Sequence, residues 1–138
     1  MKSLIVRTLV TLTLSAALSP VALLAQDHLN ATIPFAFTAG SRSFAPGDYS
    51  VRQLTNGHVL LIQNRKDGTG VMTTVMPGEQ SKKAGTYAIT FKRYGDRYFL
   101  SEVSGNDKGW LLFPSAAEKE LIAKATTPQP VVLVAASK

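Results

Sequence analysis

Apolar and polar residues alternate along several short runs of this chain, and the first clear run covers residues 30–37. Ile33, Phe35 and Phe37 fall on one side of an extended chain. An alternation with a period of two is typical of a half-buried strand. Pro34 has no backbone N–H to donate, which favours an edge position or an unpaired side for this strand.

A tight turn at Asn56 and Gly57 predicts a hairpin, because both residues tolerate the positive φ angles of a two-residue turn. This turn would place Val51 opposite Ile62. The return strand carries an unbroken apolar run at residues 59–62. A continuous run is typical of a strand with both faces covered, so we expect it to be central in its sheet.

A second tight turn at residues 95–96 predicts another hairpin, in which Phe91 would face Leu100 and Arg93 would face Tyr98. The same register places two apolar residues of the return strand on the opposite face, namely Phe99 and Val103. Either both faces are partly buried, or a β-bulge changes the direction in which the strand presents its side chains.

The remaining runs complete a mainly β pattern. Further strands are expected at residues 71–76, 110–113 and 131–135, with turn residues between them. Ser115 and Glu118 fit a capping box and predict one helix at about residues 115–125. The predicted fold is an antiparallel sandwich or small barrel of about seven or eight strands, with one α-helix in the C-terminal half.

The first 25 residues resemble a secretion signal. Lys2 and Arg7 precede an uncharged, Leu-rich run at residues 8–18, and Ala25 offers a small residue for cleavage. We therefore expect a signal peptide at residues 1–25 and a single β-rich domain at residues 26–138. The rival interpretation is an uncleaved membrane anchor over residues 8–25, which is short for spanning a bilayer.

The net charge and the residue composition limit the kinds of partner that we expect this protein to bind. The formal charge of the whole chain is +6, and removing Lys2 and Arg7 lowers it to about +4. This mild excess does not indicate a nucleic-acid-binding protein, which usually carries a dense basic stripe. The chain has no cysteine, so disulfides and a lipid-modified thiol are excluded. The expected location is periplasmic or extracellular, without a membrane span after cleavage.

Candidate chemistry is sparse. His28 and His58 are the only histidines, which is too few for a zinc site built on histidine. No serine lies in a Gly-x-Ser-x-Gly motif. Glu102 is the carboxylate of most interest, because partial burial on a strand would raise its pKa. A strand-end Glu paired with a Lys or Arg is the simpler interpretation. We expect no cofactor, no metal and no catalytic residue.

A possible binding surface lies on the second hairpin. Its members are basic or aromatic and close in sequence: Lys92, Arg93, Tyr94, Arg97 and Tyr98. Lys82 and Lys83 would extend it if their loop folds over the hairpin tip. The alternatives are a solvated basic face and packing of the aromatic residues at the core or its rim.

Several runs occur together in an order that resembles a group of small exported proteins of Acidobacteria-like soil bacteria. These runs are Ile33-Pro34-Phe35-Ala36-Phe37, Pro46-Gly47-Asp48-Tyr49-Ser50-Val51, Leu60-Leu61-Ile62, Phe91-Lys92-Arg93-Tyr94-Gly95-Asp96-Arg97-Tyr98-Phe99-Leu100 and Glu118-Lys119-Glu120-Leu121. The resemblance covers about residues 30–121. It implies a compact, exported, β-rich domain and brings no catalytic residue with it.

The sequence therefore indicates an exported, non-enzymatic β domain that acts by binding or structural contact in the cell envelope. Its expected partner is an anionic envelope component or another protein, not nucleic acid. The alternative is a carrier that holds a small apolar ligand inside a β-barrel.

Overall fold

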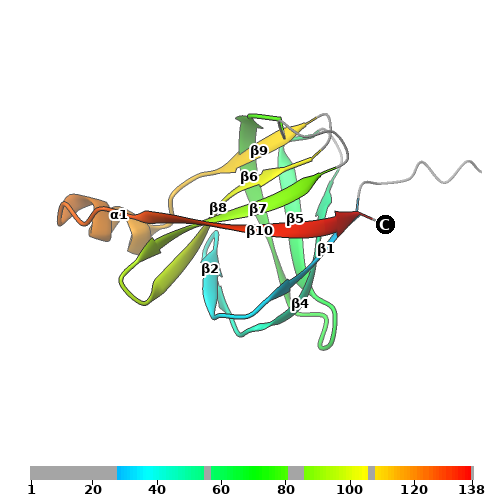
Figure 1. Ribbon diagram of the computed structural model, residues 1–138, viewed down its shortest axis with the longest axis horizontal. Coiled ribbons are helices and arrows are strands. Elements are labelled where there is room, and N and C mark those ends of the chain that lie inside the picture. Colours follow the sequence, from blue (N-terminus) through cyan, green and yellow to red (C-terminus); the bar gives the residue numbers. More distant parts are fainter. Residues whose placement is uncertain (1–27, 55–56, 81–85, 106–107, 138) are drawn as a thin grey trace, which may run out of the picture.

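The computed structural model describes residues 28–54, 57–80, 86–105 and 108–137. The expected signal peptide, its rival membrane anchor, Lys82 and Lys83 lie outside these residues. Within the described ranges the chain forms ten strands and one helix, which confirms the mainly β fold (Figure 1).

The strands run in chain order as β1 (His28–Ile33), β2 (Phe37–Ala39), β3 (Arg42–Phe44), β4 (Gly47–Gln53), β5 (Val59–Asn64), β6 (Gly70–Gly78), β7 (Tyr87–Tyr94), β8 (Arg97–Ser104), β9 (Gly109–Leu112) and β10 (Gln129–Ser137). The helix α1 (Ala116–Ala123) follows β9 and extends beyond one end of the strands (Figure 1). It ends slightly earlier than predicted, because Ala125 adopts a positive φ of 57°. Such a φ lies outside the right-handed helical region.

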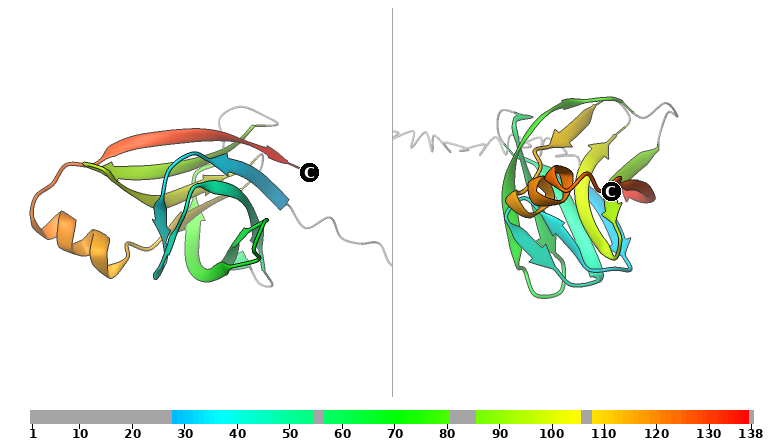
Figure 2. Two further views of the ribbon diagram at one scale, coloured as in Figure 1. Left: turned by 90° about the horizontal axis from the view of Figure 1, so that it is seen from below. Right: turned by 90° about the vertical axis from the view of Figure 1, so that its left-hand side faces the viewer.

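The strands pair in the order β3-β2-β8-β7-β10-β1-β4-β5-β6-β9, and all neighbours are antiparallel except β2 and β8. Strand β8 also pairs with β9, but only over residues 102–104. The sheet thus curves back over itself without closing into a regular barrel. The views in Figures 1 and 2 place β7, β8 and β10 along one side of the core and β4 and β5 along the other.

The fold has ten strands rather than about seven or eight because the run at residues 30–37 divides in two and a further short strand, β3, follows it. Strand β1 ends at Ile33, directly before Pro34, which cannot donate to a continuing ladder. The chain then forms the short β2–β3 hairpin, whose turn contains Gly40 with a φ of 58°. Glycine adopts this positive angle without steric cost.

The first predicted hairpin has the expected register, with Val51 opposite Ile62. Strand β5 is central, because it lies between β4 and β6. Only Leu60 and Ile62 are buried on it, whereas Val59 and Leu61 are half-buried. One face of this strand therefore belongs to the core, and the other is partly open to solvent.

Both predicted pairs of the second hairpin are present, Phe91 with Leu100 and Arg93 with Tyr98. The register then shifts, because Thr90 pairs with Glu102 and leaves Ser101 as an extra residue. The Ser101 hydroxyl donates to the Thr90 carbonyl at 3.1 Å. This β-bulge turns Val103 into the core although Phe99 is buried on the opposite face.

Aromatic rings fill one end of the space between the two sides of the sheet. The Phe37 ring centroid lies 5.0 Å from that of Tyr49 and 5.4 Å from that of Phe91, both with edge-to-face geometry. Phe44 stacks on Phe37 at 5.3 Å. The Tyr49 hydroxyl donates a hydrogen bond to the Ala45 carbonyl, so its polar end has a partner despite burial.

Candidate functional site

The structure separates the five predicted surface residues between the two faces of the β7–β8 hairpin. Arg93 and Tyr98 form one cross-strand pair, on the face that continues from Phe91. The Tyr98 ring stacks on Phe35 with a centroid distance of 3.9 Å, and the Arg93 guanidinium lies 5.6 Å from the Tyr98 ring centroid. This face closes the end of the aromatic core, as predicted for rim packing.

The opposite face of the hairpin contains Lys92, Tyr94 and Arg97. Tyr94 is only 4% exposed, and its hydroxyl donates to a Glu118 carboxylate oxygen at 3.0 Å. Burial, followed by this hydrogen bond and the negative charge of Glu118, raises the pKa of Tyr94 to about 12. Tyr94 therefore belongs to the packing beneath α1 and presents no free surface.

The exposed cations of the hairpin are Lys92, Arg93 and Arg97. The Arg97 guanidinium lies 5.2 Å from the ring centroid of Phe99, and the Arg93 Nε donates to the Gly95 carbonyl at 2.6 Å. Both arginines are thus partly engaged in intramolecular contacts. Their guanidinium groups stabilise the hairpin as well as contributing positive charge.

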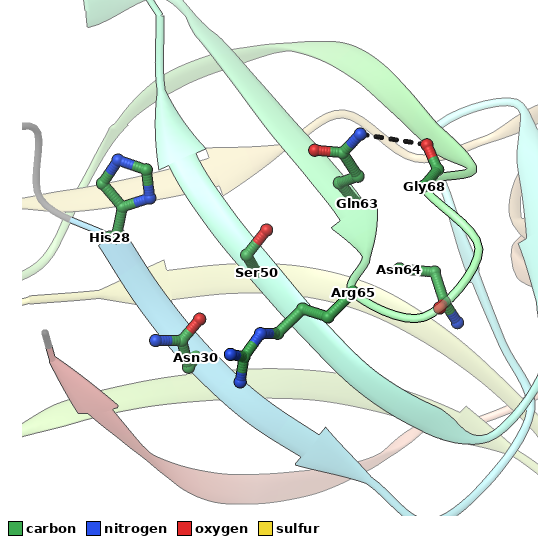
Figure 3. Close-up of a pocket in the computed structure, with 7 residues that line it drawn as sticks. All are labelled: His28, Asn30, Ser50, Gln63, Asn64, Arg65 and Gly68. Atoms are coloured by element: carbon green, nitrogen blue, oxygen red, sulfur yellow. Dashed lines mark hydrogen bonds between the residues drawn. The ribbon is translucent and has the colours of Figure 1, made fainter.

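A depression of about 560 Å³ lies on the outer face of β1, β4 and β5. The strand register places Asn30 opposite Ser50, and Ser50 opposite Gln63. These three polar side chains consequently form one row across three strands, as Figure 3 shows. Neighbouring strands lie about 4.8 Å apart, so the row spans roughly 10 Å.

The depression is also lined by His28 on β1, by Asn64 at the end of β5, and by Arg65 and Gly68 from the turn that follows. We call this surface the Arg65 depression. Figure 3 shows the Arg65 side chain extending from the end of β5 towards Asn30. The Gln63 Nε2 donates to the Gly68 carbonyl at 2.9 Å and joins β5 to the turn that follows it.

The turn beside the depression is held by its own polar groups. The Asn64 side-chain oxygen accepts from the backbone N–H groups of Lys66 and Asp67 at 2.8 and 3.2 Å. The Asp67 carboxylate accepts from the backbone N–H and the hydroxyl of Thr69 at 2.8 and 2.7 Å. The Thr69 hydroxyl, with the N–H, lowers the pKa of Asp67. These bonds position the turn without using Arg65.

The sequence interpretation identified this turn but missed the depression. Asn30, Ser50 and Gln63 occupy outward positions of three strands, of which β4 and β5 are consecutive and β1 is separated from β4 by the β2–β3 hairpin. The available signal was the repeated polar residue on an outward face, together with the turn chemistry of Asn64. The predicted hairpin register already places Ser50 opposite Gln63. Only the pairing of β1 with β4, which the sequence did not predict, adds Asn30 to them.

The remaining candidates for chemistry are scattered. His28 lines the Arg65 depression, whereas His58 is exposed at the start of the β5 side of the first hairpin. Glu102 is half-buried on β8, opposite Thr90 and Leu111. Within the described part of the chain, no group of three or more His, Cys, Asp or Glu side chains is placed to hold a metal ion.

Comparison with protein-family models, curated proteins and solved structures finds no match to this chain. Across the four described ranges, no helix has the length and apolar character needed to cross a membrane.

Proposed function

We propose that this chain is an exported, non-enzymatic β domain that acts in the cell envelope by binding or structural contact. Export is proposed from the signal-like pattern of residues 1–25. The observation that carries the binding role is the Arg65 depression, in which amide, hydroxyl and guanidinium groups line one open surface. Its volume of about 560 Å³ falls within the range of small-molecule sites.

The chemistry of the depression favours binding over catalysis. The amides of Asn30 and Gln63 can donate and accept hydrogen bonds, but they do not exchange protons as general acids or bases do. Ser50 lies between these two amides. Activation of a serine needs a base within hydrogen-bond reach, and the two residues paired with Ser50 do not supply one.

The packing of the interior also supports binding at the outer surface over a role as a carrier of an apolar ligand. Phe37, Tyr49 and Phe91 pack edge to face with centroid distances of 5.0 and 5.4 Å. Side chains of this size occupy the region in which a small β-barrel would hold an apolar ligand. We therefore place the proposed contact on the outer surface, with an anionic envelope component as the preferred partner and another protein as the alternative.

The proposal is tested by expressing the full chain in its native host, separating cytosol from envelope fractions, and recording native mass spectra. We expect a mature form that begins at Gln26, is found outside the cytosol and is retained on isolated envelope polymer. Leu14→Arg is the control for export, because a charge in the apolar run should prevent it. Retention of the unmodified chain in the cytosol, or turnover of the polymer by the protein, would contradict the proposal.

A further inference from the structure

Around the Arg65 depression, the positively charged Arg65 makes fewer contacts within the protein than the nearby carboxylates do. Among the described residues, the Arg65 side chain has neither a hydrogen bond nor an ion pair. The nearby acid Asp48 accepts a hydrogen bond from the Thr32 hydroxyl at 2.6 Å, and Asp67 accepts two bonds from Thr69. The guanidinium therefore keeps its donors available to a ligand, while both carboxylates already have partners.

A second cation lies on the same face. Arg52 is opposite His28 in the β1–β4 register and two residues beyond Ser50, so it shares the outer face of β4 with Ser50. Lys66 follows Arg65 and lines the adjoining surface with Asp48. The three cations outnumber the two carboxylates, which gives this part of the surface a net attraction for anions.

The rest of the lining is suited to hydroxyl groups. Asn30 and Gln63 each carry a carbonyl oxygen and an NH₂ group, and Ser50 carries a hydroxyl, so all three can both donate and accept. Sugar hydroxyls also donate and accept. The row spans roughly 10 Å, which suits two linked sugar rings better than a single small anion.

From these observations we infer that the Arg65 depression binds a carboxylate-bearing saccharide, such as a segment of a uronic acid polymer. The Arg65 guanidinium holds the carboxylate through two parallel N–H···O bonds, and the Asn30–Ser50–Gln63 row binds the hydroxyls of the adjacent ring. The inference rests on the proposed binding function and names the ligand class for it. No bond is made or broken in the saccharide.

The test is titration of the purified exported protein with trigalacturonate, followed by calorimetry and by chemical-shift mapping of backbone amides. We expect saturable binding, with shifts concentrated at residues 28–30, 50 and 63–68. Arg65→Gln should weaken binding roughly tenfold or more, because charge-assisted hydrogen bonds are about twice as strong as neutral ones. Arg65→Lys should recover only part of the affinity, since an ammonium group lacks the planar fork.

Lys66→Gln is the matched control, because it removes the same charge one residue away without altering the lining of the depression. We expect this variant to bind within about twofold of the native protein, apart from the small general effect of surface charge. Unchanged thermal unfolding of each variant would show that the fold is retained. Equal losses in Arg65→Gln and Lys66→Gln would overturn the role of Arg65.

Two further probes separate the parts of the inference. Galactotriose should bind weakly, and binding equal to that of trigalacturonate would overturn the carboxylate requirement. Acetate should also bind weakly, and equal affinity for acetate would overturn the saccharide requirement. Shifts confined to residues 92–98 would overturn the location. Retention on envelope polymer without any trigalacturonate binding would overturn this ligand class while leaving the proposed envelope function in place.

Discussion

The Tyr94 hydroxyl donates a 3.0 Å hydrogen bond to the carboxylate of Glu118, and this bond joins the β7–β8 hairpin to α1. Glu118 is only 3% exposed although its helix is otherwise largely open to solvent. The Ser115 hydroxyl accepts from the Glu118 N–H at 3.2 Å, as in half of the predicted capping box. The carboxylate, however, is directed to Tyr94.

Replacing Tyr94 with Phe should lower the free energy of unfolding by about 1–3 kcal/mol, because the Glu118 carboxylate would stay buried without its partner. Urea denaturation followed by circular dichroism measures the change. Glu118→Gln should cost less, since the amide oxygen can still accept from the hydroxyl. Glu120→Gln on the exposed side of the same helix is the control and should be nearly neutral. Equal stability of Tyr94→Phe and the native protein would contradict this prediction.

Stability should also fall at high pH through Tyr94. Its pKa is raised from 10.0 to about 12, so the folded state favours the neutral phenol. This contribution is complete below pH 10, and it is lost as the pH rises through about 12, because the unfolded chain then ionises more readily. Denaturation midpoints at pH 9 and pH 11.5 should differ more for the native protein than for Tyr94→Phe. The same pH dependence in both proteins would assign the effect to other groups.

Gly109 should be intolerant of any side chain. A Cβ atom there would overlap the backbone carbonyl of Glu79, which cannot rotate away as a side chain can. Gly109→Ala should therefore separate β9 from β6 locally and cost about 1–3 kcal/mol or more. Gly95→Ala is the comparison, because a Cβ at that position meets nothing within 4 Å. Its cost should come only from the positive φ and be about 1 kcal/mol. Thermal melting ranks the two variants, and a smaller loss for Gly109→Ala would refute the steric argument.

Deletion of Ser101 should remove the β-bulge and leave the pairs on both sides of it unchanged. Without the extra residue, Leu100 still faces Phe91 and Glu102 still faces Thr90, so Val103, which is 0% exposed, keeps its place in the core. The deletion variant should therefore still unfold cooperatively in calorimetry. Ser101→Ala keeps the bulge and loses only the hydrogen bond to the Thr90 carbonyl, so it should cost about 1 kcal/mol. Loss of the cooperative transition in the deletion variant would show that the bulge itself is needed for the fold.

Local sequence signals were sufficient to predict much of the sheet. The pairs Val51–Ile62 and Phe91–Leu100 follow from turn residues that fix the register within a few positions of the turn. The bulge was one of two outcomes expected from the conflict between Leu100 and Val103. Its residue became known only once Thr90 was paired with Glu102.

Features that depend on contacts between segments far apart in the chain could not be predicted from the sequence. Tyr94 looks like an exposed hairpin residue until α1 brings Glu118 over it. In the same way, the polar row in the Arg65 depression is complete only because β1 pairs with β4, whereas its β4–β5 part follows from the predicted hairpin. A single sequence records which residues face outward on each strand, but it does not record which strands are neighbours.

The short pairing between β1 and β10 has a consequence for when this chain can fold. Leu29 lies opposite Ser137, so residues near the two ends of the described chain meet in the same ladder. Until β10 is available, β7 lacks one of its two neighbours and β1 pairs only with β4. Contacts between such distant residues form late and slowly, since a long loop must close first. During synthesis the sheet therefore stays incomplete until β10 has emerged, so almost all of the described residues must be available before the two sides of the sheet can be joined.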